Sequence, residues 1–262
     1  MSAIWKYRNL RRHMRNWPLY FKRKYFKSHR PAVYVFRGGR IKIQVPDLFF
    51  YVFKEVIMED FYQIKDLLPH IPEKPVIVDI GANAGYFSFL MAAKREHAVI
   101  YAYEPIQNNI DVFNNNLKLN PGRKDSVKLE CKAVTGLEKN SEKLFFDVVN
   151  HDTVISSVFE DFSPKNIQVV EVEAISLAAI IRENKLIAID LLKLDCEGSE
   201  YPILYDSPET IWPLIKCLCI EVHELDKEKR NHKYLSTFLR QKGFHLSSRL
   251  DINGCYYLMA WK

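Results

Sequence analysis

The sequence predicts an α/β fold, in which a mostly parallel sheet is covered by helices on both faces. Three observations lead to this class. An apolar strand at 76–80 runs into a glycine-spaced turn and a new helix, a second buried strand follows at 99–103, and further strands alternate with helical segments up to residue 223. Strands that alternate with helices favour parallel pairing, because each crossover helix packs back on a face of the sheet.

Composition indicates a globular protein. The chain has 262 residues, of which 48% are hydrophobic, and this suffices for one substantial core with a modest extension. No apolar run is long enough to span a membrane and the N-terminal segment lacks the core of a secretion signal, so we expect a cytoplasmic location. An odd count of five cysteines fits that compartment. Cys217 and Cys219 share a face of one strand and are interpreted as core thiols, so no metal site is predicted.

The N-terminal arm, residues 1–30, is strongly basic. It holds ten Lys or Arg and no Asp or Glu, whereas the rest of the chain carries 28 basic and 32 acidic side chains. Trp17-Pro18 is expected to divide it into two short helices. Aromatic residues among the charges suit an anionic membrane surface or an acidic partner, so peripheral contact at the inner membrane surface is one interpretation, and a helix pair that only covers the core is the other. Nucleic acid is not the expected partner, because no RNA-binding module is present.

The region between the arm and the first core strand is predicted to be accessory. Residues 32–36 and 41–45 flank a double glycine and predict a hairpin, and residues 47–68 are predicted to be mostly helical. Three prolines between positions 69 and 75 mark a boundary near residue 72. We therefore expect an accessory region at 1–71 and a catalytic domain at 72–262.

The turn that follows the first core strand predicts a nucleotide-type cofactor. Gly81 and Gly85 let the backbone turn tightly, and the helix after them offers free N–H groups to polar ligand atoms. A dinucleotide loop would place a glycine under the pyrophosphate where this chain has Asn83, whose side chain obstructs that approach. S-adenosylmethionine, which has no phosphates, is therefore predicted, although turns of this kind also occur without a ligand.

An acidic residue ends the second core strand. Glu104 follows the strand at 99–103, on the strand expected beside the glycine turn. A carboxylate there can accept hydrogen bonds from both ribose hydroxyls, and such charge-assisted bonds are strong. This spacing supports a cofactor site more strongly than the turn alone.

Further elements continue the alternation. A helix is expected over 106–117, and a third strand follows at 127–131. Strands are also predicted at 143–149 and 169–174, around a polar loop that contains Ser156 and Ser157. A helix is then expected over 177–183.

Charged residues gather after the next two strands. The apolar strand at 189–194 ends in Asp195, Glu197 and Glu200 around a glycine turn, where active sites of α/β proteins collect, although a solvated loop is the simpler interpretation. The strand at 215–223 carries Glu221 and His223 on one face. Histidine takes up protons near neutral pH and a nearby carboxylate can orient it, so this pair favours catalysis.

These motifs together resemble the FkbM-type S-adenosylmethionine-dependent methyltransferases, over roughly residues 72 to 260. The residues that carry the resemblance are 79–85, Glu104-Pro105, 193–200 and 221–223. The resemblance implies a Rossmann-like class I methyltransferase fold with a seven-stranded sheet whose last strands form a reversed pair, expected at 244–246 and 255–260 around a turn at 251–254. Cys196 departs from the aliphatic residue more common in the family.

The resemblance also implies O-methylation of small molecules or sugars. In our hypothesis His223 is the general base, and Asp195 and Glu221 orient it or hold substrate hydroxyls. For the cofactor, Glu104 holds the ribose and Asp79 braces the turn, while the methionine end is lined by Gly81, Asn83, Gly85 and Tyr86. A divalent ion bound by Asp195, Glu221 and His223 is the alternative use of those residues.

Oxygen is the expected methyl acceptor, because Asp195-Cys196-Glu197-Gly198 stands where base-modifying amine methyltransferases carry a D/N-P-P-Y/F type motif. The predicted substrate carries a hydroxyl on a small molecule or a glycan, and a lipid-linked or polymeric glycan would suit the basic arm. The alternatives are a nicotinamide-dependent oxidoreductase, which Asn83 disfavours, and a noncatalytic membrane-surface adaptor with a methyltransferase-like core. The sequence predicts no oligomeric state.

Overall fold

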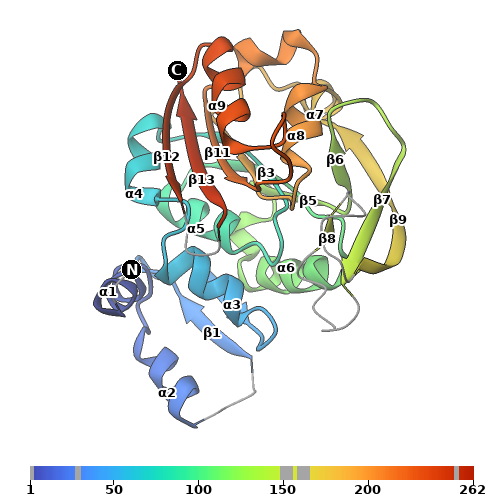
Figure 1. Cartoon of the computed structure of the whole chain (residues 1–262). Coiled ribbons are helices and arrows are strands. Elements are labelled where there is room, and N and C mark those ends of the chain that lie inside the picture. The colour runs from blue at the N-terminus through green and yellow to red at the C-terminus, as the bar shows by residue number, and fades with distance from the viewer. Residues whose placement is uncertain (1–2, 27–30, 148–155, 158–165, 251–253) are drawn as a thin grey trace.

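A seven-stranded mixed sheet forms the centre of the computed structural model (Figure 1), which describes residues 3–26, 31–147, 156–157, 166–250 and 254–262. The strand order is β12-β13-β11-β10-β3-β4-β5. All strands run parallel except β13, which is antiparallel to both of its neighbours. The strands are β3 (Val76–Ile80), β4 (Val99–Tyr103), β5 (Val127–Glu130), β10 (Leu191–Leu194), β11 (Cys217–Val222), β12 (His245–Leu250) and β13 (Tyr256–Trp261). The predicted α/β class and its reversed last pair are confirmed.

Two apolar clusters cover the two faces of this sheet. Side chains alternate along each strand, so Ile77 and Ile100 enter one cluster while Val78 and Tyr101 enter the other. The first cluster also takes residues from α5 (Tyr86–Lys94) and α6 (Gln107–Leu119). The second takes them from α7 (Leu177–Glu183), α8 (Glu200–Tyr205) and α9 (His232–Gln241). Helices therefore lie on both faces, as predicted, and Cys217 and Cys219 are buried core thiols.

The N-terminal region contributes to the first cluster. The arm forms two helices, the second of which begins at Pro18, and the predicted hairpin and helical stretch are present. Leu10, Met14 and Tyr34 pack in the same cluster as Phe89 of α5, so these segments help to form the core. The boundary near residue 72 stays a prediction. The elements are α1 (Ala3–His13), α2 (Pro18–Phe26), β1 (Ala32–Val35), β2 (Lys42–Val45), α3 (Phe50–Phe53), the π-helical η1 (Lys54–Met58), α4 (Ile64–Leu67) and η2 (Leu68–His70).

Two asparagines, Asn116 of α6 and Asn120 directly after it, connect the hairpin to α6 and to the turn after β3. The side-chain oxygen of Asn116 accepts a hydrogen bond from the Gln44 backbone N–H at 2.6 Å, and its nitrogen donates to the Ala84 carbonyl at 3.1 Å. Asn120 accepts from the Lys42 N–H at 2.8 Å. Both side chains are buried, and buried amides need such partners.

A second sheet lies on the opposite side of the molecule from β12 (Figure 1). The strands predicted at 143–149 and 169–174 are present, but they pair antiparallel with each other and do not join the central sheet. Their alternating pattern predicts strands without fixing the sheet to which they belong. This sheet has the order β6-β9-β7-β8 and contains β6 (Ala133–Thr135), β7 (Ser141–Asp147), β8 (Ser156–Ser157) and β9 (Asn166–Ser176). Residues 148–149 of the first predicted strand lie outside the described residues.

The remaining short helices are 3-10 turns. They are η3 (Pro121–Arg123), which follows α6, and η4 (Glu209–Leu214). Positions 251–253 of the predicted final turn lie outside the described part of the chain. Within the described ranges, no helix has the length and apolar character needed to cross a membrane.

Candidate active site

The turn between β3 and α5 has a backbone that only certain residues accept. Gly81 and Gly85 have φ angles of +71° and +82°, and Asn83 has a φ of +50°. A Cβ atom on Gly81 would lie 1.8 Å from the carbonyl oxygen of Asp195, and one on Gly85 would lie 2.7 Å from the Phe113 ring. Asn83 tolerates the left-handed region, and its side-chain oxygen accepts a hydrogen bond from the Ala84 N–H at 2.7 Å. The turn is therefore held close to both β10 and α6.

Glu104 connects this turn to the end of β4. One carboxylate oxygen accepts a hydrogen bond from the Asn83 N–H at 2.8 Å, and the other accepts from the Ile106 N–H at 3.0 Å and from the Asn109 side chain at 3.1 Å. Burial raises the pKa of the Glu104 carboxyl, although these three donors oppose the rise. The predicted position beside the turn is confirmed, and its role toward the ribose stays a prediction.

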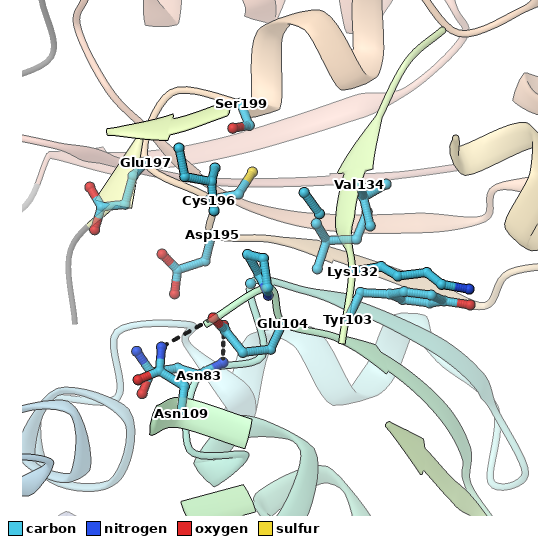
Figure 2. A pocket seen from close by; sticks show the side chains of 15 residues that line it. Asn83, Tyr103, Glu104, Asn109, Lys132, Val134, Asp195, Cys196, Glu197 and Ser199 are labelled. Carbon is cyan, nitrogen blue, oxygen red and sulfur yellow. Dashed lines mark hydrogen bonds between the residues drawn. The ribbon is translucent and has the colours of Figure 1, made fainter. Parts of the chain in front are cut away.

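These residues line a pocket that is partly open to solvent (Figure 2). Gly81, Asn83 and Glu104 line it, whereas Asp79, Gly85 and Tyr86 do not. The Tyr86 hydroxyl donates to the Gln44 carbonyl at 3.2 Å, on the side of the hairpin. The complete lining is Ile80, Gly81, Asn83, Tyr103, Glu104, Pro105, Asn109, Lys132, Ala133, Val134, Leu144, Asp195, Cys196, Glu197 and Ser199.

Asn109 is a cavity residue that the sequence analysis missed. Its side chain is only 2% exposed, and its amide oxygen has no hydrogen-bond partner within the described residues. A buried acceptor without a partner is costly, and a ligand hydroxyl or amine would satisfy it. Only its place on the first turns of α6 after Glu104 could have drawn attention to it.

The second sheet also contributes to the cavity. Val134 of β6 and Leu144 of β7 line it, and so does Lys132, which directly precedes β6. Cys196 lines it from the turn after β10, and burial raises the pKa of its thiol far above the ordinary value, so this thiol stays neutral. The cavity thus has an acidic end at Asp195 and Glu197 and a more apolar side formed by the second sheet.

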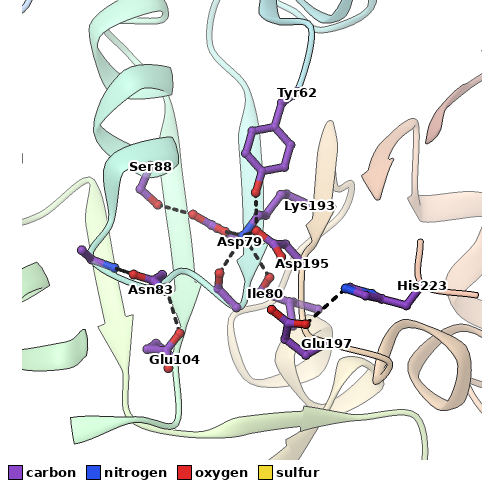
Figure 3. A network of polar contacts seen from close by, with 12 residues as sticks. Tyr62, Asp79, Ile80, Asn83, Ser88, Glu104, Lys193, Asp195, Glu197 and His223 are labelled. Carbon is purple, nitrogen blue, oxygen red and sulfur yellow. Dashed lines mark hydrogen bonds and ion pairs between the residues drawn. The ribbon is translucent and has the colours of Figure 1, made fainter. Parts of the chain in front are cut away.

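A buried lysine lies between two aspartates beneath the turn (Figure 3). The Lys193 ammonium is 3.2 Å from Asp79 and 3.4 Å from Asp195, and it donates to the Gly81 carbonyl at 2.6 Å. Burial alone would lower the pKa of Lys193, but the two carboxylates hold it above its ordinary value. Asp79 also accepts from the Ser88 hydroxyl at 2.6 Å. These contacts tie β3, β10 and α5 together, as the predicted bracing role of Asp79 requires.

Asp195 and Glu221 carry different charges in this arrangement. Burial would raise the pKa of Asp195, but Lys193 and hydrogen bonds from Glu221 and Tyr62 lower it to about 2. Burial and the charge of Asp195 raise the pKa of Glu221 well above its usual value. These opposite shifts favour the proton of the pair on Glu221, which donates a hydrogen bond to the carboxylate of Asp195. Tyr62, whose hydroxyl donates to Asp195, comes from the N-terminal region, where no local signal marks it.

His223 lies directly after β11, between two carboxylates. Its Nδ1 is 3.1 Å from Glu200 and its Nε2 is 3.2 Å from Glu197. Burial would lower its pKa, but hydrogen bonds with Cys255, Glu197 and Glu200 raise it far above the ordinary value. This arrangement favours the charged ring, which cannot accept a proton. The general-base role of His223 stays a prediction, and it requires that one ring nitrogen first become free of its proton.

One group of potential metal ligands is present within the described ranges. Ligand atoms of Glu221, His223 and Cys255 all lie within 4.8 Å of one another. Cys255 was not part of the ligand set considered from the sequence.

Comparison with known proteins connects this site to a family. A family model described as the methyltransferase FkbM domain matches residues 79–246. Methyltransferase sdnD of Sordaria araneosa is 29% identical over 224 residues, which cover 75% of this chain and 82% of that protein. The 31-O-demethyl-FK506 methyltransferase FkbM of Streptomyces tacrolimicus is 24% identical over 172 residues, which cover 58% of this chain and 66% of that protein.

A solved structure shares the fold. The crystal structure of a methyltransferase FkbM from Methylobacillus flagellatus KT matches with a TM-score of 0.51 at 14% identity. The match covers 72% of this chain and 44% of that chain, so this chain spans less than half of that protein. At this identity the similarity shows the fold alone, which is the α/β fold of a class I methyltransferase.

Proposed function

The chain belongs to the FkbM methyltransferase family, and from this premise we propose that it transfers a methyl group to a hydroxyl oxygen of a small molecule or glycan. It is a methyltransferase whose cofactor is S-adenosylmethionine, as membership in the family implies. When bound, this cofactor supplies an electrophilic methyl group. The observation that carries the proposal is one cavity that is lined both by Glu104 and Asn109 near the glycine turn and by the carboxyl groups of Asp195 and Glu197.

The residues at the glycine turn fit the cofactor. The unpartnered oxygen of Asn109 and the carboxylate of Glu104 are acceptors at the cavity wall, and ribose hydroxyls are donors. Gly81, which has no side chain, and Asn83 line the same cavity. We propose that Glu104 and Asn109 hold the ribose and that Gly81 and Asn83 contact the methionine end. Asp79 would act beneath the turn, and Gly85 and Tyr86 would shape it without touching the ligand.

The carboxylates at the other end favour a hydroxyl acceptor. Asp195 is ionised at neutral pH and lines the cavity with Glu197, so both can accept hydrogen bonds from substrate hydroxyls. We propose that Asp195, Glu221 and His223 orient the acceptor oxygen and take part in handling its proton. The relative from Streptomyces tacrolimicus supports oxygen as the acceptor, since its name describes a 31-O-demethyl substrate.

A membrane contact through the N-terminal arm is proposed in addition. Ile4, Tyr25 and Phe26 are 81%, 71% and 78% exposed, and the exposed Lys22 and Lys24 lie on the same short helix as the two aromatic residues. Exposed aromatics beside basic side chains suit an anionic bilayer. We propose a cytoplasmic protein that touches the inner membrane surface, with an accessory region at 1–71 and a catalytic domain at 72–262.

The arm can be tested by sedimentation with vesicles. Anionic vesicles should retain the protein in proportion to their charge, and neutral vesicles should not. Replacing Tyr25 and Phe26 with Ser should release it without a change in thermal stability, because both side chains are exposed. Equal binding of the double variant would remove the membrane proposal and leave the enzymatic one intact.

The catalytic proposal is tested with cofactor and acceptor separately. Calorimetry should show binding of S-adenosylmethionine and its demethylated product, and no binding of a nicotinamide dinucleotide. A panel of hydroxylated small molecules and glycans is then incubated with a labelled methyl donor, and mass spectrometry locates the methyl group. Transfer of the methyl group to nitrogen or carbon would contradict the proposal of an oxygen acceptor. Absence of cofactor binding would contradict the proposal that the protein is an active enzyme. The matches found give no support to the oxidoreductase or the adaptor.

A further inference from the structure

We propose that Glu221, His223 and Cys255 form a binding site for a divalent transition-metal ion, zinc or a metal with similar ligand preferences. Metal binding itself is independent of the proposed function, whereas the use of the metal toward a hydroxyl substrate rests on that function. From the sequence no metal is predicted, and the alternative ligand set there is Asp195, Glu221 and His223. The pairing of β11 with β13 adds Cys255 to Glu221 and His223.

The register of two antiparallel strands brings the three residues together. Glu221 pairs with Tyr257 and Val222 pairs with Tyr256, so the next position of each strand places His223 opposite Cys255. Cross-strand partners point to the same side of a sheet, with Cβ atoms about 5 Å apart. Glu221 is two positions before His223 and therefore lies on that side as well. The cluster is thus a direct result of the reversed strand.

The distances and ligand types suit a small transition-metal site. In tetrahedral zinc sites with bonds of about 2.0 to 2.3 Å, neighbouring ligand atoms lie roughly 3.5 Å apart. The three ligand atoms here lie within 4.8 Å of one another, so small side-chain adjustments would close the site. Imidazole nitrogen and thiolate sulfur favour zinc and its neighbours over magnesium or calcium, which prefer oxygen ligands.

A buried carboxylate already orients the histidine. Glu200 is fully buried and faces Nδ1 of His223 at 3.1 Å, while it also accepts from the His223 backbone N–H at 3.0 Å. This directs Nε2 away from Glu200. Metal-binding histidines commonly donate their second N–H to such a carboxylate, which fixes the tautomer and the orientation of the ring.

The charge around Nε2 favours a cation at this position. Glu197 lies 3.2 Å from Nε2 and holds a left-handed φ of +51°, an uncommon conformation for a glutamate. Glu197 and Glu200 face the two ring nitrogens of His223, and Asp195 faces Lys193, so the surroundings of the ring are rich in carboxyl groups. A divalent ion would take the place of the proton between Nε2 and Glu197.

The site lies next to the proposed acceptor end of the cavity. Glu221 hydrogen-bonds to Asp195, which lines the cavity together with Glu197. Glu221 and Cys255 are both partly exposed, so a ligand can reach the metal. Three protein ligands leave a fourth position for water or a substrate hydroxyl, as in catalytic rather than structural zinc sites.

Cobalt titration tests the proposal through a spectroscopic signal. The full chain, without a polyhistidine tag, is freed of metal with a chelator and titrated with Co²⁺ and then with Zn²⁺. We expect one equivalent of Co²⁺ to give a thiolate charge-transfer band and the strong visible absorption of tetrahedral cobalt, both removed by Zn²⁺. Cys255→Ser should lose the charge-transfer band, and Glu221→Gln should weaken binding about tenfold or more.

Cys131→Ser is the matched control, because Cys131 is exposed and lies outside the cluster. It should keep the spectrum of the unaltered protein. No band in the unaltered protein, or an unchanged band in Cys255→Ser, would overturn the proposal. Calorimetry with S-adenosylmethionine on the same samples separates the two ideas. Cofactor binding without cobalt binding would contradict only the proposed metal site. Cobalt binding without cofactor binding would contradict only the proposed function.

Discussion

The hydroxyl of Tyr62 donates a hydrogen bond to the carboxylate of Asp195 across 133 positions of the chain. Tyr62 belongs to the region before the matched family segment, whereas Asp195 ends a central strand. The Tyr62 ring packs against Phe61, Phe87 and Tyr257, so the hydroxyl is held in place by the core. A residue outside the matched segment therefore helps to fix a cavity carboxylate.

Tyr62→Phe should reduce turnover about tenfold while cofactor affinity changes little. The variant keeps the ring packing and removes one hydrogen bond to Asp195, so the loss in stability should be near 1 kcal/mol. Steady-state kinetics and calorimetry measure the two effects. Tyr34→Phe is the matched control, since Tyr34 is also a fully buried tyrosine of the N-terminal region but does not line the cavity. Equal turnover of both variants would contradict a role for Tyr62 at the cavity.

Glu104→Gln should weaken S-adenosylmethionine binding at least tenfold. Both oxygens of Glu104 accept hydrogen bonds from protein donors, and an amide nitrogen at either position would face a donor instead. We also expect a loss of about 1–3 kcal/mol in the free energy of unfolding. Calorimetry and urea denaturation provide the measurements. Glu130→Gln, at the exposed end of β5, should leave both quantities near their original values, and a normal affinity in Glu104→Gln would argue against a ribose contact.

Lys193→Met should destabilise the fold by about 3–5 kcal/mol. Removal of the ammonium leaves Asp79 and Asp195 buried without their shared counter-ion. A second change, Asp79→Leu, should restore part of the loss because it removes one unpaired charge. Lys139→Met provides the comparison, since its ion pair with Glu142 is largely exposed and should contribute less than 1 kcal/mol. Urea denaturation of the original protein and of the three variants measures these differences. Equal losses of stability in Lys193→Met and Lys139→Met would contradict the counter-ion role of Lys193.

His13 should make the protein less stable in mild acid. Burial, followed by the charges of Lys94 and Arg12, lowers its pKa from 6.5 to about 3. Between these values the unfolded chain binds a proton that the folded chain does not, so stability falls as the pH falls and is unaffected above the higher value. The slope from this group is about 1.4 kcal/mol per pH unit.

The measurement is the free energy of unfolding at several pH values for the original protein and for His13→Gln. The difference between their curves should be flat above pH 6.5 and slope below it. His245→Gln, at an exposed strand position, should follow the original protein. Parallel curves for the original protein and His13→Gln would show that the ring does not stay neutral in the fold.

Local patterns were sufficient to predict much of the central sheet. The apolar strand and glycine turn at 76–85 predicted β3 and its cavity, and the position of Glu104 at the end of β4 followed from spacing alone. The hydrogen bond from the Asn83 N–H to the Glu104 carboxylate confirms that the two residues lie side by side. Such features depend on residues close in sequence, and single-chain patterns report those well.

Contacts between distant segments could not be predicted in the same way. Tyr62 and Asn109 carry no distinctive pattern, and their importance depends on tertiary packing against β10 and β4. Cys255 meets His223 only because of the antiparallel register of β13. The strands β7 and β9 have the alternation of any half-buried strand, so their pairing in a separate sheet needed the folded structure.

The two-sided bonding of Asn116 gives the hairpin and the glycine turn a common anchor. A shortened version of the protein that begins at residue 72 would leave this amide with an unused acceptor and would uncover apolar side chains of α5. The region before the matched family segment is therefore needed to stabilise the conformation of the glycine turn. Removal of residues 1–71 would produce an enzyme with a lower affinity for its cofactor.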